Sequence, residues 1–161
     1  MGPELTTAIS WAHIGSSVVA VISGPLVLLL RKGDRRHRRI GHVYVWSMVV
    51  LNATAFLIYR LLGTFGPFHI AAVISALTLA AGMRPVLRKQ RREGWMVEHM
   101  SYMLWSVIGL YAAFFSEILV RSPWRGPFAT VVGMATALLV ILGFVVQRPL
   151  VRRWSREVGA R

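Results

Sequence analysis

The sequence predicts an all-α integral membrane protein, a bundle of five transmembrane helices forming one transmembrane domain over residues 1–161. Three observations lead to this prediction. Of the 161 residues, 55% are hydrophobic and 16% are charged, whereas about a quarter of the residues in a soluble domain are charged. The Lys and Arg residues gather in alternate loops. Between them, five stretches carry no Asp, Glu, Lys or Arg: 5–30, 40–59, 61–83, 99–116 and 126–147.

Each charge-free stretch is long enough to cross a bilayer as a helix. A helix rises about 1.5 Å per residue, so about 20 apolar residues cross a hydrocarbon core of ~30 Å. Helices are favoured over a barrel because barrel strands show ~10-residue segments of alternating polarity. A helix also pairs its own backbone groups, as lipid requires. We expect spans at about 7–30, 41–60, 67–84, 97–118 and 127–147.

Local signals support these spans in chain order. The first span is not a cleavable signal peptide, because it has no positive start and arginines follow it. Gly24-Pro25 lies inside it and predicts a kink. The second and fourth spans each follow a basic loop. Pro67 and Pro127 open the third and fifth spans, where the first helical turn needs no N–H donor.

The basic loops also predict the orientation of the chain. Segments 31–39, 84–98 and 148–161 hold six, five and five Lys or Arg residues, and the alternate side holds three arginines. This positive-inside pattern places the N-terminus outside and the C-terminus in the cytoplasm, and we expect the cell inner (plasma) membrane as the location. No basic–aromatic module remains outside the spans, so nucleic-acid binding is not expected. Without cysteine there is no thiolate metal site or thiol nucleophile.

The histidines carry the main functional signal. None of the five lies at the middle of the membrane or on the fifth span. His13 and His69 lie towards the outer face, on the first and third spans. His99 opens the fourth span from the inside, while His37 and His42 flank the inner start of the second. The set divides into an outer pair and an inner group.

This alternation matches what two b-type haems stacked across a four-helix core need, with the fifth helix outside that core. Haem iron takes two axial imidazoles from facing helices. We therefore expect haem b between His13 and His69 at the outer face, and between His99 and either His37 or His42 at the inner face. Depth in the membrane favours His42. Two iron centres make an electron path across the bilayer, to a redox partner or a quinone. The alternative for each histidine is an interfacial residue with a wet tip.

Glu117 and Arg60 are the second unusual feature. Glu117 lies 18 residues after His99, and Arg60 lies 18 residues after His42, which is a whole number of helical turns. If those histidines face the bundle interior, Glu117 and Arg60 meet at its outer mouth and tune the outer centre. Ionisable residues facing such an interior are functional candidates. A plain surface pair of Glu117 with Arg121 at i+4 explains the carboxylate equally well.

Two other interpretations stay open. His13, His69 and Glu117 lie at the outer face on three spans, and two imidazoles with a carboxylate make a zinc set with an open position for water. Such a zinc or copper site would hold the metal or hydrolyse a lipid or peptide bond, so enzymatic activity is undecided. The third interpretation is a cofactor-free bundle that forms a homo-oligomer or joins a membrane complex through small residues of its fifth span. These small residues are Gly133, Ala137 and Gly143.

The segment HRRIGHVY (37–44) resembles the H-R-x-x-G-x-x-Y motif of an uncharacterised family of predicted bacterial multi-pass membrane proteins. Similarity extends over about residues 10–125 and includes His13-Ile14, Gly24-Pro25-Leu26, His99–Met103 and segment 105–121. The resemblance implies no activity that can be carried over. It implies His37 as the motif histidine, together with Arg38, Gly41 and Tyr44.

The motif and the depth of the side chains therefore favour different inner ligands. His37 and His42 lie about 140° apart at 100° per residue, so both cannot face one centre. The histidine layout also resembles diheme b-type transmembrane cytochromes, which pass electrons across membranes. That likeness is one of architecture.

Overall fold

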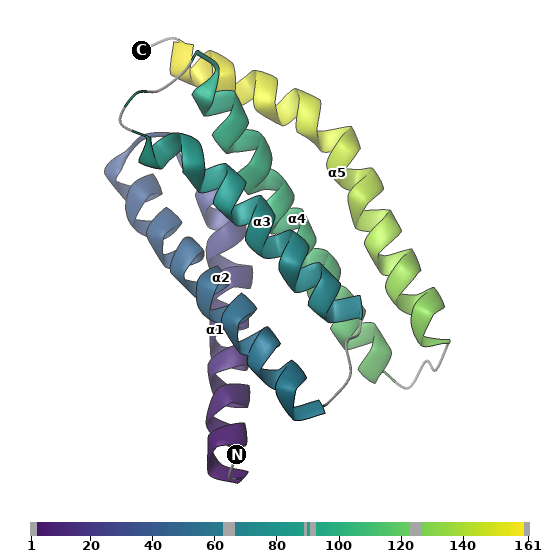
Figure 1. Cartoon of the computed structure of the whole chain (residues 1–161). Coiled ribbons are helices and arrows are strands. Elements are labelled where there is room, and N and C mark those ends of the chain that lie inside the picture. The colour runs from purple at the N-terminus through teal and green to yellow at the C-terminus, as the bar shows by residue number, and fades with distance from the viewer. Residues whose placement is uncertain (1–2, 63–66, 89, 91–92, 123–126, 160–161) are drawn as a thin grey trace. The chain divides into compact units, whose positions relative to one another are not determined.

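The computed structural model of the chain consists of five α-helices (Figure 1). They are α1 (Pro3–Leu29), α2 (Arg35–Leu62), α3 (Pro67–Leu87), α4 (Trp95–Arg121) and α5 (Phe128–Gly159). The structure describes residues 3–62, 67–88, 90, 93–122 and 127–159, with side chains for 4–58, 69–88, 90, 93–122 and 127–156. Over these residues there is no strand, and all five helices are long and apolar enough to cross a membrane. The predicted all-α membrane fold is confirmed.

Two helices extend well beyond their predicted spans. α2 begins at Arg35 and not near residue 41, so the basic residues before the second span are helical. α5 continues to Gly159, far past the predicted end at residue 147. Arginine is a good helix former, and a helix can leave the hydrocarbon without ending. The first and last charges of a span therefore mark the edge of the lipid, and not the end of the helix.

The chain divides into two compact parts, residues 1–79 and 80–161, and each is described by itself. In the first part α1 packs along α2 (Figure 1). Ala20 and Val27 of α1 are buried, and Tyr44 and Met48 of α2 are fully buried. The four-helix core concerns both parts together and stays a prediction.

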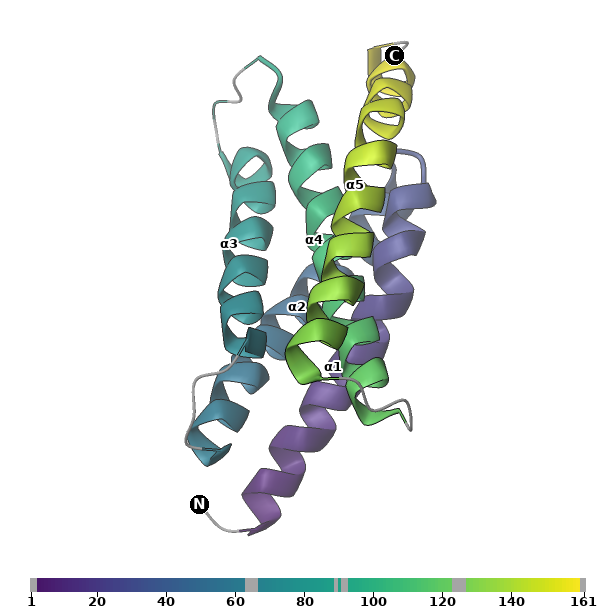
Figure 2. The ribbon, with the colours of Figure 1, turned by 90° about the vertical axis from the view of Figure 1, so that its right-hand side faces the viewer.

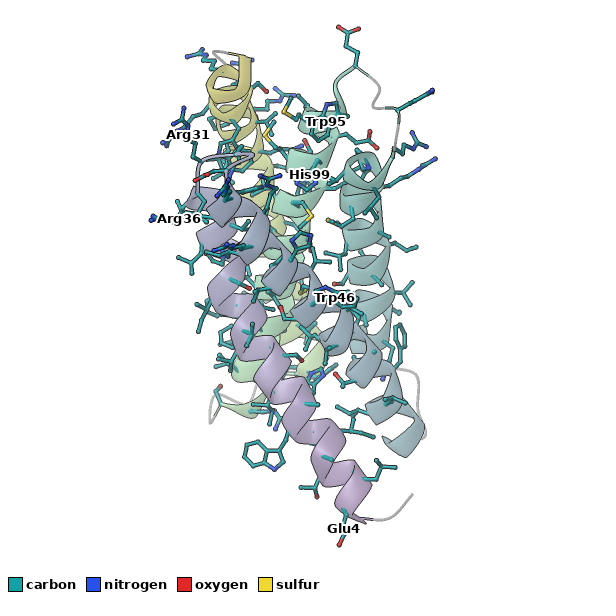
Figure 3. The ribbon with its side chains drawn as sticks, turned by 90° about the vertical axis from the view of Figure 1, so that its left-hand side faces the viewer. Glu4, Arg31, Arg36, Trp46, Trp95 and His99 are labelled. Carbon is teal, nitrogen blue, oxygen red and sulfur yellow. The ribbon has the colours of Figure 1, made fainter. Side chains whose placement is uncertain are left out.

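Lys32 closes the turn between α1 and α2. Its buried ammonium donates to the carbonyl oxygens of Val27, at 3.2 Å, and Leu28, at 2.6 Å. The last carbonyls of a helix lack intrahelical partners and form the negative end of its dipole, so a cation is stabilising there. Arg31 and Arg36 lie at this same end of the helix pair, and Glu4 lies at the opposite end of α1 (Figure 3).

In the second part α4 and α5 lie side by side (Figure 2). Trp105 of α4 contacts α5 in two ways: its indole N–H donates to Gln147 Oε1 at 3.2 Å, and its ring meets Phe144 edge-on with 4.8 Å between centroids. A Cβ atom placed on Gly143 would lie 3.0 Å from the Trp105 ring. Gly143 therefore provides the space for the indole. By contrast, a Cβ at Gly133 would meet nothing within 4 Å.

The outward faces of the helices expose large apolar side chains. On α5 only 6% of the most apolar window is buried, and Met134 and Leu138 are 69% and 68% exposed. Ala137 is also exposed, so among the predicted small residues Gly143 makes the contact with α4. Apolar surface on this scale is stable only against lipid or another apolar partner. A lipid bilayer is the environment of this protein.

Candidate functional site

The histidines lie on four helices, as the sequence predicts. They are His13 on α1, His37 and His42 on α2, His69 on α3 and His99 on α4. Because α2 begins at Arg35, His37 lies on the first turn of a helix and not in a loop. His42 is exposed, and the other four are half-buried.

His99 links the start of α4 to α3 within the second part of the chain. Its Nδ1 lies 2.7 Å from the carbonyl oxygen of Gly82. A carbonyl oxygen can only accept, so Nδ1 carries the hydrogen and donates it. Figure 3 shows His99 one turn after Trp95, at the beginning of α4. The imidazole is thereby held by the backbone of the neighbouring helix.

Gly82 makes this close approach of α3 and α4 feasible. A Cβ atom at residue 82 would lie 2.9 Å from Met103 Sδ and 3.2 Å from Tyr102 Cβ. Met103 follows His99 by one helical turn, so the two share a face of α4. A larger residue at position 82 would push α3 away from the face that carries the histidine.

His37 makes the equivalent link in the first part. Its Nδ1 lies 3.2 Å from the carbonyl oxygen of Val27, near the end of α1. Gly41 packs on the same residue, since a Cβ there would lie 3.6 Å from Val27 Cγ2. Tyr44, one further turn along α2, is fully buried. Three residues of the H-R-x-x-G-x-x-Y segment thus face α1, while Arg38 is exposed.

His13 is held by a side chain. Its Nδ1 lies 2.9 Å from the hydroxyl oxygen of Thr54 on α2. That oxygen is also 2.8 Å from the carbonyl of Val50 and 3.0 Å from that of Leu51. The single hydroxyl hydrogen is directed to these carbonyls, so the oxygen accepts the N–H of His13. Thr54 is buried, and it belongs to the site although the sequence analysis did not identify it.

The three imidazoles share one arrangement. Each donates Nδ1–H to an oxygen atom of a neighbouring helix, and in a neutral ring this leaves the lone pair on Nε2. A histidine that binds a metal through one nitrogen almost always donates its other N–H to a carbonyl, carboxylate or water, which orients the ring and raises its basicity. The arrangement is suited to ligand chemistry at Nε2.

The remaining predicted site residues are His69, Glu117 and Arg60. His69 lies on the first turn of α3 and is half-buried. Glu117 accepts a hydrogen bond from Arg121 Nε at 2.7 Å on its own helix, and both side chains reach solvent. This is the surface pair that the sequence allowed. The side chain of Arg60 lies outside the described residues, so its meeting with Glu117 stays a prediction.

Among the described side chains, no group of three or more His, Asp or Glu residues is gathered to hold a metal ion. The proposed zinc set draws His13 and His69 from the first part and Glu117 from the second. It stays a prediction. Haem needs only two axial ligands at each iron, so the absence of such a group among these side chains does not test it.

The comparisons with known proteins give a family. Residues 10–154 match the family described as predicted membrane protein (DUF2306). The chain belongs to this family. The match begins within α1, ends within α5 and extends past residue 125, where the resemblance in the sequence ended. No curated protein and no solved structure matches it.

The family describes a membrane protein and no activity. This agrees with the predicted membership of a family of membrane proteins. The H-R-x-x-G-x-x-Y motif as a family signature, and the likeness to diheme cytochromes, stay predictions. For this DUF2306 protein the functional argument therefore depends on its own histidines.

Proposed function

We propose that the protein binds haem b through histidine side chains and transfers electrons across the membrane. The observation that supports this best is the hydrogen bond that Nδ1 makes in three of the five imidazoles: His13 to Thr54, His37 to Val27 and His99 to Gly82. It fixes each ring and directs the basicity to Nε2, the nitrogen through which these histidines would hold the iron.

The proposed ligands lie at two levels of the helices. His37 and His99 belong to the first two turns of α2 and α4, and His13 lies in the half of α1 that leads in from the N-terminus. With the predicted orientation, the first two are near the cytoplasmic face and the third is nearer the outer face. We assign His69 as the second outer ligand, from the sequence pairing.

His37 is the better candidate for the inner ligand on α2. It is half-buried with its ring held by Val27, whereas His42 is exposed. A ligand needs a fixed ring, because reorganisation of a mobile one weakens binding. This favours the histidine that the family resemblance implied over the one that depth favoured.

When bound, a haem iron with two imidazoles supplies one-electron chemistry. The protein side chains orient the imidazoles and keep the site apolar; ligand identity, hydrogen bonding and burial are the means by which a protein sets the potential. The electron donor and acceptor would be a redox partner or a quinone at the two faces.

The test is to purify the protein in detergent from haem-replete cells and record its absorption spectrum. We expect a Soret band that His13→Gln or His99→Gln lowers by about half, since each removes one of two centres. His37→Gln should act like His99→Gln. His42→Gln is the matched control, five residues along the same helix, and should leave the band unchanged.

Three outcomes would contradict the proposal. Colourless protein that is folded by circular dichroism would exclude haem, and metal analysis of the same sample would then reveal zinc or copper, or no cofactor. Equal loss from His37→Gln and His42→Gln would exclude the selective role of His37. Loss of both centres with a lowered melting temperature in every variant would mean that the histidines only hold the helices together.

A further inference from the structure

The last turns of α5 carry a basic face that the proposed electron transfer does not use. The charge-free run ends at residue 147, and the helix continues to Gly159. Four exposed arginines follow the run: Arg148, Arg152, Arg153 and Arg156. At 100° per residue they fall within an arc of about 140°. The charges are thus collected on one side of the helix.

The opposite side of this segment is packed. Trp154 is only 5% exposed, and Leu150 and Val151 are half-buried. These three positions lie outside the arc of the arginines. The helix end is therefore amphipathic, and its burial on one side fixes which way the guanidinium groups face.

The arginines border a hollow. Pro149, Arg152, Arg153 and Arg156 line it. Guanidinium groups present planar sets of donors that match the oxygens of a phosphate. No acidic residue occurs between positions 148 and 156, and the tail has one, Glu157, whose side chain lies outside the described residues.

An apolar stripe continues the same side of α5 into the membrane. Leu138, Ile141 and Val145 lie within the arc that the arginines define, and they are 68%, 61% and 67% exposed. One side of the helix thus presents exposed alkyl surface followed directly by four guanidinium groups. This order matches the acyl chain and the phosphate of a phospholipid.

We propose that this hollow binds the head group of an anionic phospholipid, with an acyl chain along the apolar stripe. The position favours a lipid over a soluble anion, because the hollow begins at Pro149, two residues after the charge-free run ends, and therefore borders the level of the head groups. Basic side chains at this level are attracted to anionic lipid.

The test is the lipid retained by the full-length protein. The protein is reconstituted in nanodiscs of phosphatidylcholine and phosphatidylglycerol, released, and analysed by native mass spectrometry. We expect phosphatidylglycerol to be enriched over phosphatidylcholine. The variant Arg152→Gln/Arg153→Gln/Arg156→Gln should reduce this enrichment by about tenfold or more, because it removes three of the attracting side chains.

The matched control is Arg35→Gln/Arg36→Gln/Arg39→Gln, which removes three exposed arginines from the start of α2. It should keep most of the enrichment. An equal fall in both variants would mean that net charge alone causes the enrichment. An unchanged enrichment in the first variant would exclude the hollow as the binding site. Release of the lipid from wild-type protein by inorganic phosphate, but not by chloride of equal ionic strength, would assign the hollow to a soluble anion.

Discussion

Oxygen atoms of neighbouring helices bind the Nδ1 atoms of three of the proposed ligands. The carbonyls of Val27 and Gly82 hold His37 and His99, and the hydroxyl of Thr54 holds His13. Only the last of these partners is a side chain, so it is the one that mutation can remove without moving a helix. A substitution of Thr54 can therefore change the orientation of the His13 ring without changing the packing of the helix that carries it.

We expect Thr54→Val to weaken the outer centre. Valine has nearly the shape of threonine but cannot accept the N–H of the half-buried His13, and the loss of a hydrogen bond of this kind costs about 0.5–1.5 kcal/mol. The midpoint potential of the outer haem should shift, and the melting temperature should fall. Redox titration and thermal unfolding measure the two effects. Thr54→Ser, which retains the hydroxyl, should behave as wild type; a normal outer centre in Thr54→Val would exclude the role of this hydrogen bond.

At this scale the sequence predicts which helix each histidine lies on, and little of what it contacts. His13 and His99 are visible in the chain because a polar residue in a charge-free run is conspicuous, whereas His37 lies in a basic segment and was singled out by the family resemblance. Backbone carbonyls have no signature in the sequence, so the partners of His37 and His99 could not be foreseen. Thr54 was visible as a polar residue in the second span, but nothing in the spacing relates it to His13.

At the scale of the helices, the close packing of α4 against α5 at Trp105 requires a small residue, Gly143. Trp105 contacts Gly143, Phe144 and Gln147 of α5. The ring is rigid and bonded at its N–H, so it cannot retreat readily from an added side chain. Interiors at native packing density resist even one extra methyl group.

We therefore expect Gly143→Ala to destabilise the protein by about 1–3 kcal/mol, as overpacking typically does. Gly133→Ala is the control on the same helix, where a Cβ meets nothing within 4 Å. It should be neutral or slightly stabilising, because alanine has the higher helix propensity. Thermal unfolding in detergent measures both. A Gly143→Ala protein as stable as Gly133→Ala would show that α5 moves freely along α4.

The number and order of the helices could be predicted because hydrocarbon imposes a minimum apolar length. Their ends could not. α2 begins earlier than predicted and α5 ends later. Arginine is excluded from the hydrocarbon but not from a helix, so the charged residues mark where the lipid ends and the helix continues past them. The basic end of α5 became recognisable as a helix face only with the structure.

For the whole molecule, the unequal distribution of Lys and Arg predicts the orientation. Because the sequence has no cysteine, a single introduced thiol can report it. Glu4→Cys should react with a membrane-impermeant maleimide in intact spheroplasts, and Glu93→Cys only after permeabilisation, since the two exposed positions lie on opposite sides of the predicted topology. Labelling in the reverse order would show that the chain has the opposite orientation, and the two proposed haem centres would then exchange membrane faces.

The relation between the two parts of the chain is where prediction from sequence ends. Contacts within a helical hairpin follow from short loops, whereas the pairing of His99 with His37 depends on how the two parts of the chain assemble. Small-residue patterns fit cofactor contact and plain helix packing alike. The redox spectrum of the variants is the direct measure of those pairings.

The turn after α1 bears on how the protein is made. His37 and Lys32 both donate to Val27, at separations of ten and five residues. Closing so short a loop loses little entropy. We expect these two hydrogen bonds to Val27 to form while the ribosome is still translating the chain, before the third helix exists. The first two helices would then enter the bilayer as a hairpin.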